Sequence, residues 1–460
     1  MMQGLMNWLE KYIIPIAAKI GNEKHLVALR DGFIGTMPAT MAGSIAVLLN
    51  AFLRDFPTTW GWTGFVTAME PIIGINGYVW LGSLAIVAVI FAVALGYNLA
   101  KVYHVDPLSG AVVALAAFFM GLTQTATTNL ALSEKIPGNM VKLINEAGGS
   151  VTDGNTIVTS AWGFFNFDAH MGGSGLFTAI IFGFISVVIF SKLMLANITI
   201  KMPDSVPPAV AKAFAAIIPA CVALYTCGLI NYGFSKLTGM PMIDWITSTI
   251  QEPLLNLSQG FGAVLLIVFL VHLLWFFGIH GDNVMAPVLS TIWGNAMNQN
   301  MNAFQNGQDI PYKWVSGTFQ AFVWPGGSGA TLMLIVAIFV FSKRPDSRAV
   351  ANLSIGPGIF NINEPVMFGM PIVLNPLYMI PVILAPCVMA GVAYFATMTG
   401  LVAPVVVSVI WVMPPIVNGF LATGGDWRAI ILSIVNLAIA FVIWAPFVIA
   451  ANKIKLEDVD

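Results

Sequence analysis

Long apolar runs recur along the whole 460-residue chain and are separated by short polar segments. A helix that crosses a bilayer needs about 20 mostly apolar residues, and eleven runs approach or exceed this length. They cover residues 30–53, 78–99, 106–124, 171–192, 212–235, 258–280, 324–342, 350–375, 377–398, 400–420 and 428–451. The pattern therefore predicts an all-α polytopic membrane protein.

Basic residues lie in alternate loops of this pattern and predict its orientation. They are Lys11, Lys19, Lys24 and Arg30 before the first run, Lys101 after the second, Lys192, Lys201 and Lys212 after the fourth, Lys343, Arg344 and Arg348 after residue 342, and Lys453 and Lys455 at the end. Lysine and arginine mark cytoplasmic loops, so we expect both termini to face the cytoplasm.

The start of the chain combines apolar and basic residues over positions 1–28, which is typical of a helix lying on the membrane surface. No basic stretch, short apolar core and small-residue cleavage site follow one another there. We therefore expect no removable signal peptide, and the first apolar run should serve as the targeting signal.

The second half of the chain contains more apolar runs than its basic loops allow as full crossings. If all the basic loops are to lie on the cytoplasmic side, some of these runs cannot cross the membrane completely. We therefore expect about ten transmembrane helices plus two re-entrant hairpins, around 283–318 and 350–375. The first half shows simple spans, whereas the second is interrupted. We therefore expect residues 1–212 to form a membrane scaffold that also dimerises, and residues 213–460 to bind and transport the substrate.

The composition agrees with a protein whose main partner is the lipid bilayer. It is 58% hydrophobic and 9% charged, whereas soluble domains contain about 25% charged residues. A net charge of −2 gives no reason to expect nucleic acid as a partner. Cys221, Cys227 and Cys387 lie in apolar runs and read as small buried hydrophobes. No residues have metal-ligand spacing, so we expect neither a metal nor a cofactor.

One acidic residue stands out in the C-terminal part of the chain. From residue 349 to residue 425, Glu364 is the only Asp, Glu, Lys or Arg. Four prolines and three glycines surround it within residues 356–376, which makes a continuous helix unlikely to form there. Broken backbone in a membrane is tolerated where protein covers it or where it lines a wet cavity. An isolated ionisable residue at such a break indicates a functional site.

A second polar position follows the run 258–280. His280 lies between Gly278 and Gly281, which permit close approach of a ligand or of another segment. The alternative is a histidine satisfied by a backbone carbonyl at a helix end. Asp282 follows directly and could orient the histidine or the hairpin, whereas His272 in a plain apolar run is expected to be structural.

Three motifs together resemble one known family. They are WFFGIHG at 275–281, GGSGAT at 326–331 and INEP at 362–365, and the segments KMPDSVPP at 201–208 and DGFIGTMPATMAGS at 31–44 extend the likeness over the chain. The sequence resembles the membrane-spanning IIC component of a bacterial phosphoenolpyruvate-dependent sugar phosphotransferase system, in its lactose, cellobiose and diacetylchitobiose branch. That resemblance implies a homodimer in the bacterial cytoplasmic membrane.

The resemblance implies group translocation. A disaccharide binds from outside, and its 6-hydroxyl is phosphorylated from a phosphocysteine on a separate IIB protein. It also implies that His280 and Glu364 contact the sugar and that Trp411 is a stacking surface. Chemistry agrees, because a carboxylate can accept a hydroxyl proton as the oxygen attacks phosphorus. We therefore assign catalytic roles to Glu364 and His280.

Other substrate-binding candidates keep alternative roles. Asn361 and Asn363 offer amides that match a hydroxyl's donor and acceptor character, or they cap a broken hairpin. Trp411 is a stacking surface or belongs to an interfacial belt. Gly281 permits backbone approach to the ligand, and the GGSGAT segment approaches a ligand or allows close helix packing.

Two other classes of function compete with a phosphotransferase permease. In a proton-coupled secondary sugar transporter, Glu364 and His280 would relay protons. A passive channel is disfavoured because it does not need a carboxylate at a broken helix. Within the leading hypothesis the phosphodonor is another protein, since no stretch of about 100 residues outside the apolar runs remains to build one. The sequence does not choose among β-linked disaccharides, and cellobiose is the first expectation.

Overall fold

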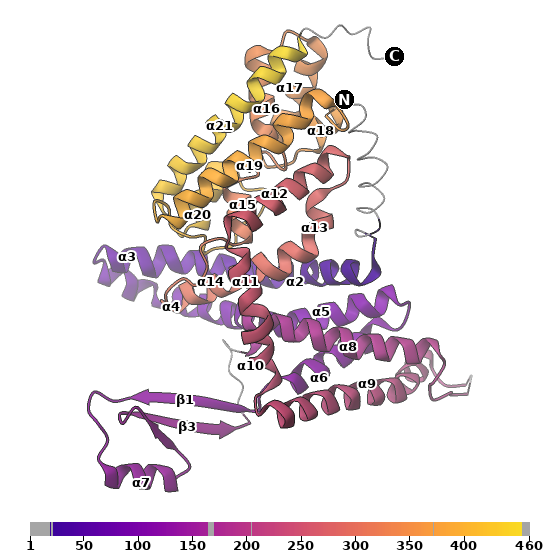
Figure 1. The fold of residues 1–460 in the computed structure, drawn as a ribbon, viewed down its shortest axis with the longest axis vertical. Coiled ribbons are helices and arrows are strands. Elements are labelled where there is room, and N and C mark those ends of the chain that lie inside the picture. Colours follow the sequence, from indigo (N-terminus) through magenta and orange to yellow (C-terminus); the bar gives the residue numbers. More distant parts are fainter. Residues whose placement is uncertain (1–18, 20–21, 164–169, 204, 371, 453–460) are drawn as a thin grey trace.

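The structure is a computed structural model that describes residues 19, 22–163, 170–203, 205–370 and 372–452. Most of the surface helix expected over residues 1–28, and the basic residues Lys453 and Lys455, lie outside this part of the chain. The described chain is largely helical, and Figure 1 shows two groups of helices, the C-terminal group lying against the long first helix of the N-terminal group.

The first group contains the long N-terminal helices. Its elements are α2 (Lys24–Asn50), the π-helical turn η1 (Ala51–Asp55), α3 (Phe56–Thr59), α4 (Thr63–Leu81), the 3-10 turn η2 (Leu84–Ile86), α5 (Val87–Val102), α6 (Pro107–Gly121), the 3-10 turn η4 (Gly173–Gly175), α8 (Leu176–Leu195) and α9 (Pro208–Thr238). Glycine permits close packing of two helices in this group, where Gly96 of α5 meets Gly110 of α6.

The link between the groups consists of α10 (Met242–Ile246), the π-helical turn η5 (Thr247–Gln251) and α11 (Glu252–Ser258) (Figure 1). The chain then bends by 76° into α12 (Phe261–Phe276). Helix α9 precedes the link and packs on α6 and α8 through Cys227 and Phe182. By its packing, α9 therefore lies with the helices that precede it in the chain.

The second group encloses the largest apolar core of the described residues. Its elements after α12 are α13 (Gly281–Leu289), the π-helical turn η6 (Ser290–Gly294), α14 (Asn295–Gln305), α15 (Ser316–Phe322), α16 (Thr331–Phe341), α17 (Pro345–Ile359), α18 (Glu364–Gly369), α19 (Pro376–Met398), α20 (Pro415–Ala422) and α21 (Trp427–Ala451). Trp314, Phe319 and Trp444 are among the fully buried side chains of this core.

The expectation of an all-α protein is wrong for one part of the chain. Strands β1 (Thr125–Ala131), β2 (Ser150–Thr152) and β3 (Thr156–Trp162) form an antiparallel sheet in the order β1-β3-β2, and α7 (Gly138–Glu146) accompanies it. Figure 1 shows this module standing apart from the helices. No long apolar run marks these strands, because they lie between the runs at 106–124 and 171–192.

Six helices in the described part are long and apolar enough to cross a membrane, or seven if the bent pair around residue 260 is one span. The six are Lys24–Thr59, Thr63–Val102, Gly173–Leu195, Pro208–Thr238, Pro376–Met398 and Trp427–Ala451. Helices α6 and α16 are apolar but shorter. The protein is therefore a multi-pass helical membrane protein, and length alone gives fewer spans than the ten expected.

The proline- and glycine-rich stretch around Glu364 is broken, as expected. Helix α17 ends at Ile359, and Asn361 adopts a left-handed conformation with φ 61° before α18 begins at Glu364. This left-handed residue reverses the chain, because it cannot continue a right-handed helix. The break places the carboxylate at the start of a new short helix.

Candidate functional site

A cavity of 590 Å³ lies between α2 of the first group and several broken elements of the second group. Its size falls within the range of about 300–1,000 Å³ typical of small-molecule sites. Five of the six residues expected to bind substrate line it, namely His280, Asn361, Asn363, Glu364 and Trp411. Residues more than 80 positions apart in the chain therefore share one cavity.

His280 occupies the N-cap of α13. Its Nδ1 accepts a hydrogen bond from the backbone N–H of Asn283 at 3.3 Å, and its ring packs against that of Trp275 with centroids 4.4 Å apart and planes inclined by 47°. A neutral imidazole whose Nδ1 accepts must carry its proton on Nε2. The cap and the contact with Trp275 thus fix the ring and leave Nε2–H as a donor for a ligand oxygen.

Glu364 begins α18, directly after its N-cap residue Asn363. Its side chain is exposed at the cavity, and within the described residues it forms neither a hydrogen bond nor an ion pair. A carboxylate accepts hydrogen bonds from hydroxyls without competition when no side chain already occupies it. Glu364 is therefore available to a polar ligand.

The two asparagines differ in how much of their amide is already used. Asn361 donates from Nδ2 to the carbonyls of Trp411 and Met413 at 2.7 and 2.8 Å, and its Oδ1 accepts from the N–H of Gly326 at 2.8 Å. Both of its N–H groups are engaged, so its role is to hold three segments together. Asn363 donates one N–H to the carbonyl of Ser328 at 3.0 Å and retains a donor and an acceptor.

Trp411 and Gly281 have different surroundings. The indole of Trp411 is 46% exposed and lines the cavity, so an aromatic face is available there. Gly281 is buried and is not among the cavity-lining residues. A Cβ at Gly281 would meet the carbonyl of Val271 in α12, so this glycine allows α13 to pack against α12.

One wall of the cavity comes from α2, which the sequence led us to treat as scaffold. Phe33, Thr36, Met37, Thr40 and Met41 line it. The spacing of Thr36 and Thr40 by four residues is the available sequence signal, because such residues share one face of a helix. Without the fold, nothing indicates that this face meets the second group.

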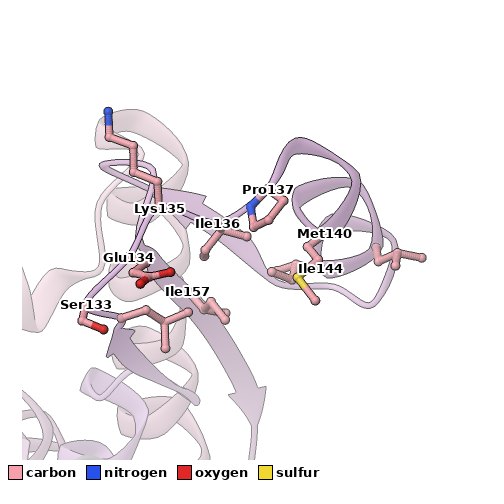
Figure 2. A pocket seen from close by; sticks show the side chains of 10 residues that line it. Ser133, Glu134, Lys135, Ile136, Pro137, Met140, Ile144 and Ile157 are labelled. Carbon is pink, nitrogen blue, oxygen red and sulfur yellow. The ribbon is translucent and has the colours of Figure 1, made fainter.

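A second hollow of 610 Å³ lies in the β module, between α7 and the strands, and Figure 2 shows the side chains that surround it. Apolar residues such as Ile136, Met140 and Ile144 dominate it, with Glu134 and Lys135 at its edge. It contains none of the residues singled out from the sequence. The cavity between the helix groups is therefore the candidate site.

Other titratable groups do not form a competing centre in the described part of the chain. His272 is fully buried and bonds the carbonyl of Val268 through Nδ1 at 2.6 Å, which agrees with a structural role. No cluster of three His, Cys, Asp or Glu side chains that could hold a metal ion occurs among the described residues.

Comparison with known proteins gives consistent results. Residues 30–386 match the family described as "Phosphotransferase system, EIIC". The cellobiose-specific EIIC component of Lactococcus lactis subsp. lactis (strain IL1403) is 46% identical, and the alignment covers 100% of both chains. The oligo-beta-mannoside-specific EIIC component of Bacillus subtilis (strain 168) is 35% identical over 97% of this chain and 94% of that protein.

A solved structure shares the whole fold. The crystal structure of the transporter ChbC, the IIC component from the N,N'-diacetylchitobiose-specific phosphotransferase system, superposes with a TM-score of 0.86. It is 35% identical in sequence, and the match covers 98% of this chain and 99% of that one. The resemblance noted on three short motifs thus extends from end to end of the described architecture.

Proposed function

The chain belongs to the phosphotransferase-system EIIC family, and from this membership we propose that it binds a β-linked disaccharide of the cellobiose type, carries it across the cytoplasmic membrane and presents its 6-hydroxyl for phosphorylation. The observation that supports this proposal is the cavity in which a fixed His280 lies together with Glu364, whose side chain has no hydrogen-bond or ion-pair partner among the described residues. Its phosphodonor is a phosphocysteine on a separate IIB protein.

The chemistry follows from the two side chains. The carboxylate of Glu364 accepts the proton of the sugar 6-hydroxyl while the oxygen attacks phosphorus. A new O–P bond forms, the S–P bond of the phosphocysteine breaks, and the cysteine leaves as a thiolate. His280 Nε2–H and the free part of the Asn363 amide bond neighbouring hydroxyls, and Trp411 covers the C–H face of one ring.

The remaining features of this proposal concern topology and partners. We propose that α6 and α16 also cross the membrane, that the segments around 283–318 and 350–375 form the two re-entrant hairpins, and that both termini face the cytoplasm. The protein acts as a homodimer through its first group of helices. The phosphorylated IIB protein docks through opposite charge on the cytoplasmic segments that carry Lys201, Lys212, Lys343, Arg344 and Arg348.

The function is tested with sealed vesicles that contain the purified protein. Labelled cellobiose is supplied outside, with phosphorylated or unphosphorylated IIB protein inside, and the accumulated sugar is identified. We expect cellobiose 6-phosphate only with the phosphorylated partner. Accumulation of unmodified sugar driven by a pH gradient would instead identify a proton-coupled transporter. Competition by lactose and diacetylchitobiose in the same vesicles ranks the three sugars.

A further inference from the structure

Asp282 lies at the cavity immediately after the His280-Gly281 pair and is not assigned a role in the proposed chemistry. It is the second residue of α13, half-buried, and it lines the cavity. Its Oδ2 accepts two hydrogen bonds, from Trp275 Nε1 at 3.0 Å and from Ser328 Oγ at 2.6 Å. Its Oδ1 is buried and has no partner among the described residues.

The two donors come from two different segments that line the cavity, the end of α12 and the loop before α16. Trp275 is the residue against which the His280 ring packs. Ser328 lies in the glycine-rich loop 326–329, and its carbonyl accepts the Asn363 Nδ2–H bond at 3.0 Å. Asn363 directly precedes Glu364 and forms the N-cap of its helix. A continuous path of contacts therefore runs from His280 through Asp282 to Glu364.

The glycine-rich loop 326–329 takes part in these contacts because its glycines adopt backbone conformations that other residues rarely adopt. Gly326, Gly327 and Gly329 all have φ between 80° and 92°, and a Cβ at Gly327 would meet Asn363. The loop therefore lies directly on the turn that precedes Glu364, where a side chain would not fit. A shift of Ser328 is transmitted to the Glu364 side of the cavity by contact.

We propose that Asp282 is a positioning residue that sets the separation between His280 and Glu364 around the bound sugar. This inference rests on the proposed function. It concerns residues that do not react with the sugar, so it is separable from the roles of His280 and Glu364 themselves. Small misplacement of catalytic groups is sufficient for a large effect, since a displacement of about 1 Å can reduce a rate by about 100-fold.

The contacts of Asp282 indicate that it acts as an acceptor and not as a charge. Both of its donors are neutral groups, and no ion pair to Asp282 forms within the described part of the chain. The amide oxygen of an asparagine can accept the same two hydrogen bonds. The Asp282→Asn variant should therefore retain the positioning role, whereas Asp282→Ala should lose it.

The first measurement compares these two variants in phosphorylation of cellobiose by phosphorylated IIB protein and in equilibrium binding of the sugar. We expect Asp282→Ala to lower turnover about 100-fold and to weaken affinity much less, because misplacement affects the reaction more than the contacts. Asp282→Asn should stay within a few-fold of the wild type. Asp309→Ala, at an exposed loop position away from the cavity, is the matched control.

A double-mutant cycle identifies the path. If Asp282 acts through Ser328, the variant Asp282→Ala/Ser328→Ala should be no slower than Asp282→Ala alone. Trp275→Phe, which keeps the ring under His280 and removes only the N–H donor, should show the same non-additivity with Asp282→Ala. The apparent melting temperatures of these variants in detergent, measured without sugar, test the same non-additivity between Asp282 and its two donors.

The results separate the two levels of inference. Wild-type protein that does not phosphorylate any of the sugars would overturn the proposed function, and the melting temperatures would still decide the contact path. Normal turnover in Asp282→Ala, additive effects in the cycle, or an Asp282→Asn variant as slow as Asp282→Ala would each overturn the positioning role of Asp282.

Discussion

At the scale of single residues, the sequence alone singles out Glu364 and His280, which line one cavity in the structure, because each is conspicuous for a physical reason. Glu364 is an isolated carboxylate in an apolar stretch that cannot remain helical, and His280 follows a glycine at the end of an apolar run. Asn361 was also singled out, but the structure shows that backbone groups occupy its amide hydrogens. Tertiary contacts decide which polar atoms of a side chain remain free for a ligand, and these contacts cannot be read from the sequence.

Replacement of Glu364 by glutamine tests the proton-accepting role. Glutamine keeps the size and the hydrogen-bonding oxygen but cannot take the hydroxyl proton, so phosphorylation should fall by at least about 100-fold. Sugar binding, measured by calorimetry on the purified protein, should persist in part, and the apparent melting temperature should stay near that of the wild type. Turnover close to normal would contradict the role.

Replacement of His280 by alanine tests its contact with the sugar. Loss of one hydrogen bond costs about 0.5–1.5 kcal/mol, so the dissociation constant should rise by up to about tenfold. His280→Asn is the control, because asparagine is also a strong N-cap residue and retains a donor. If both variants bind the sugar as the wild type does, His280 does not contact it.

At the scale of elements, the break before Glu364 could be predicted, but what stabilises it could not. Prolines and glycines between residues 356 and 376 exclude a continuous helix. The stabilising contacts come from Asn361, which links its turn to Gly326 and to the segment after Trp411. Those partners lie about 35 and 50 positions away, and no local pattern reveals them.

The variant Asn361→Asp tests this link. Aspartate tolerates the left-handed conformation, but it cannot donate to the carbonyls of Trp411 and Met413. A buried acceptor left unpaired costs about 1–3 kcal/mol, so the apparent melting temperature should fall clearly. The same substitution at Asn306, an exposed loop position, should have little effect. Equal melting temperatures for the two variants would refute the link.

Close packing of α5 against α6 is a second element-scale feature that can be tested. A Cβ at Gly96 would meet Ala114 and the carbonyl of Gly110, so Gly96→Val must separate the helices. Overpacking of this kind costs about 1–3 kcal/mol or more, and we expect a lower melting temperature and less folded protein in detergent. Gly77→Val in α4, where nothing lies within 4 Å, is the control and should fold normally.

At the scale of the whole molecule, the membrane class and the family followed from the sequence, whereas the β module did not. Hydrophobic runs report spans because the bilayer demands them. The bilayer imposes no such length or hydrophobicity on a small sheet outside the helices, so the sequence carries only weak signals of its strands. One of them was Asp153-Gly154 between β2 and β3, a dipeptide that favours a tight turn, and both residues have positive φ.

Removal of the β module tests whether it is needed for transport. Thr128 and Thr159 are paired across β1 and β3, so the residues between them can be replaced by a two-residue Asn-Gly turn. None of the α7 residues is buried, so the helices should fold without the module. We expect unchanged cellobiose binding and phosphorylation in vesicles. A loss of either activity in well-folded protein would show that the module takes part in transport.

The wall that α2 contributes to the cavity has a consequence for how the sugar leaves. His280 and Glu364 belong to one group of helices, whereas Phe33, Met37 and Met41 belong to the other and offer mainly apolar contacts. Separation of these two surfaces would open the cavity while the polar side chains kept their grip on the sugar. The second group of helices would then determine how tightly the sugar binds, and the movement of α2 away from it would determine how fast the sugar dissociates.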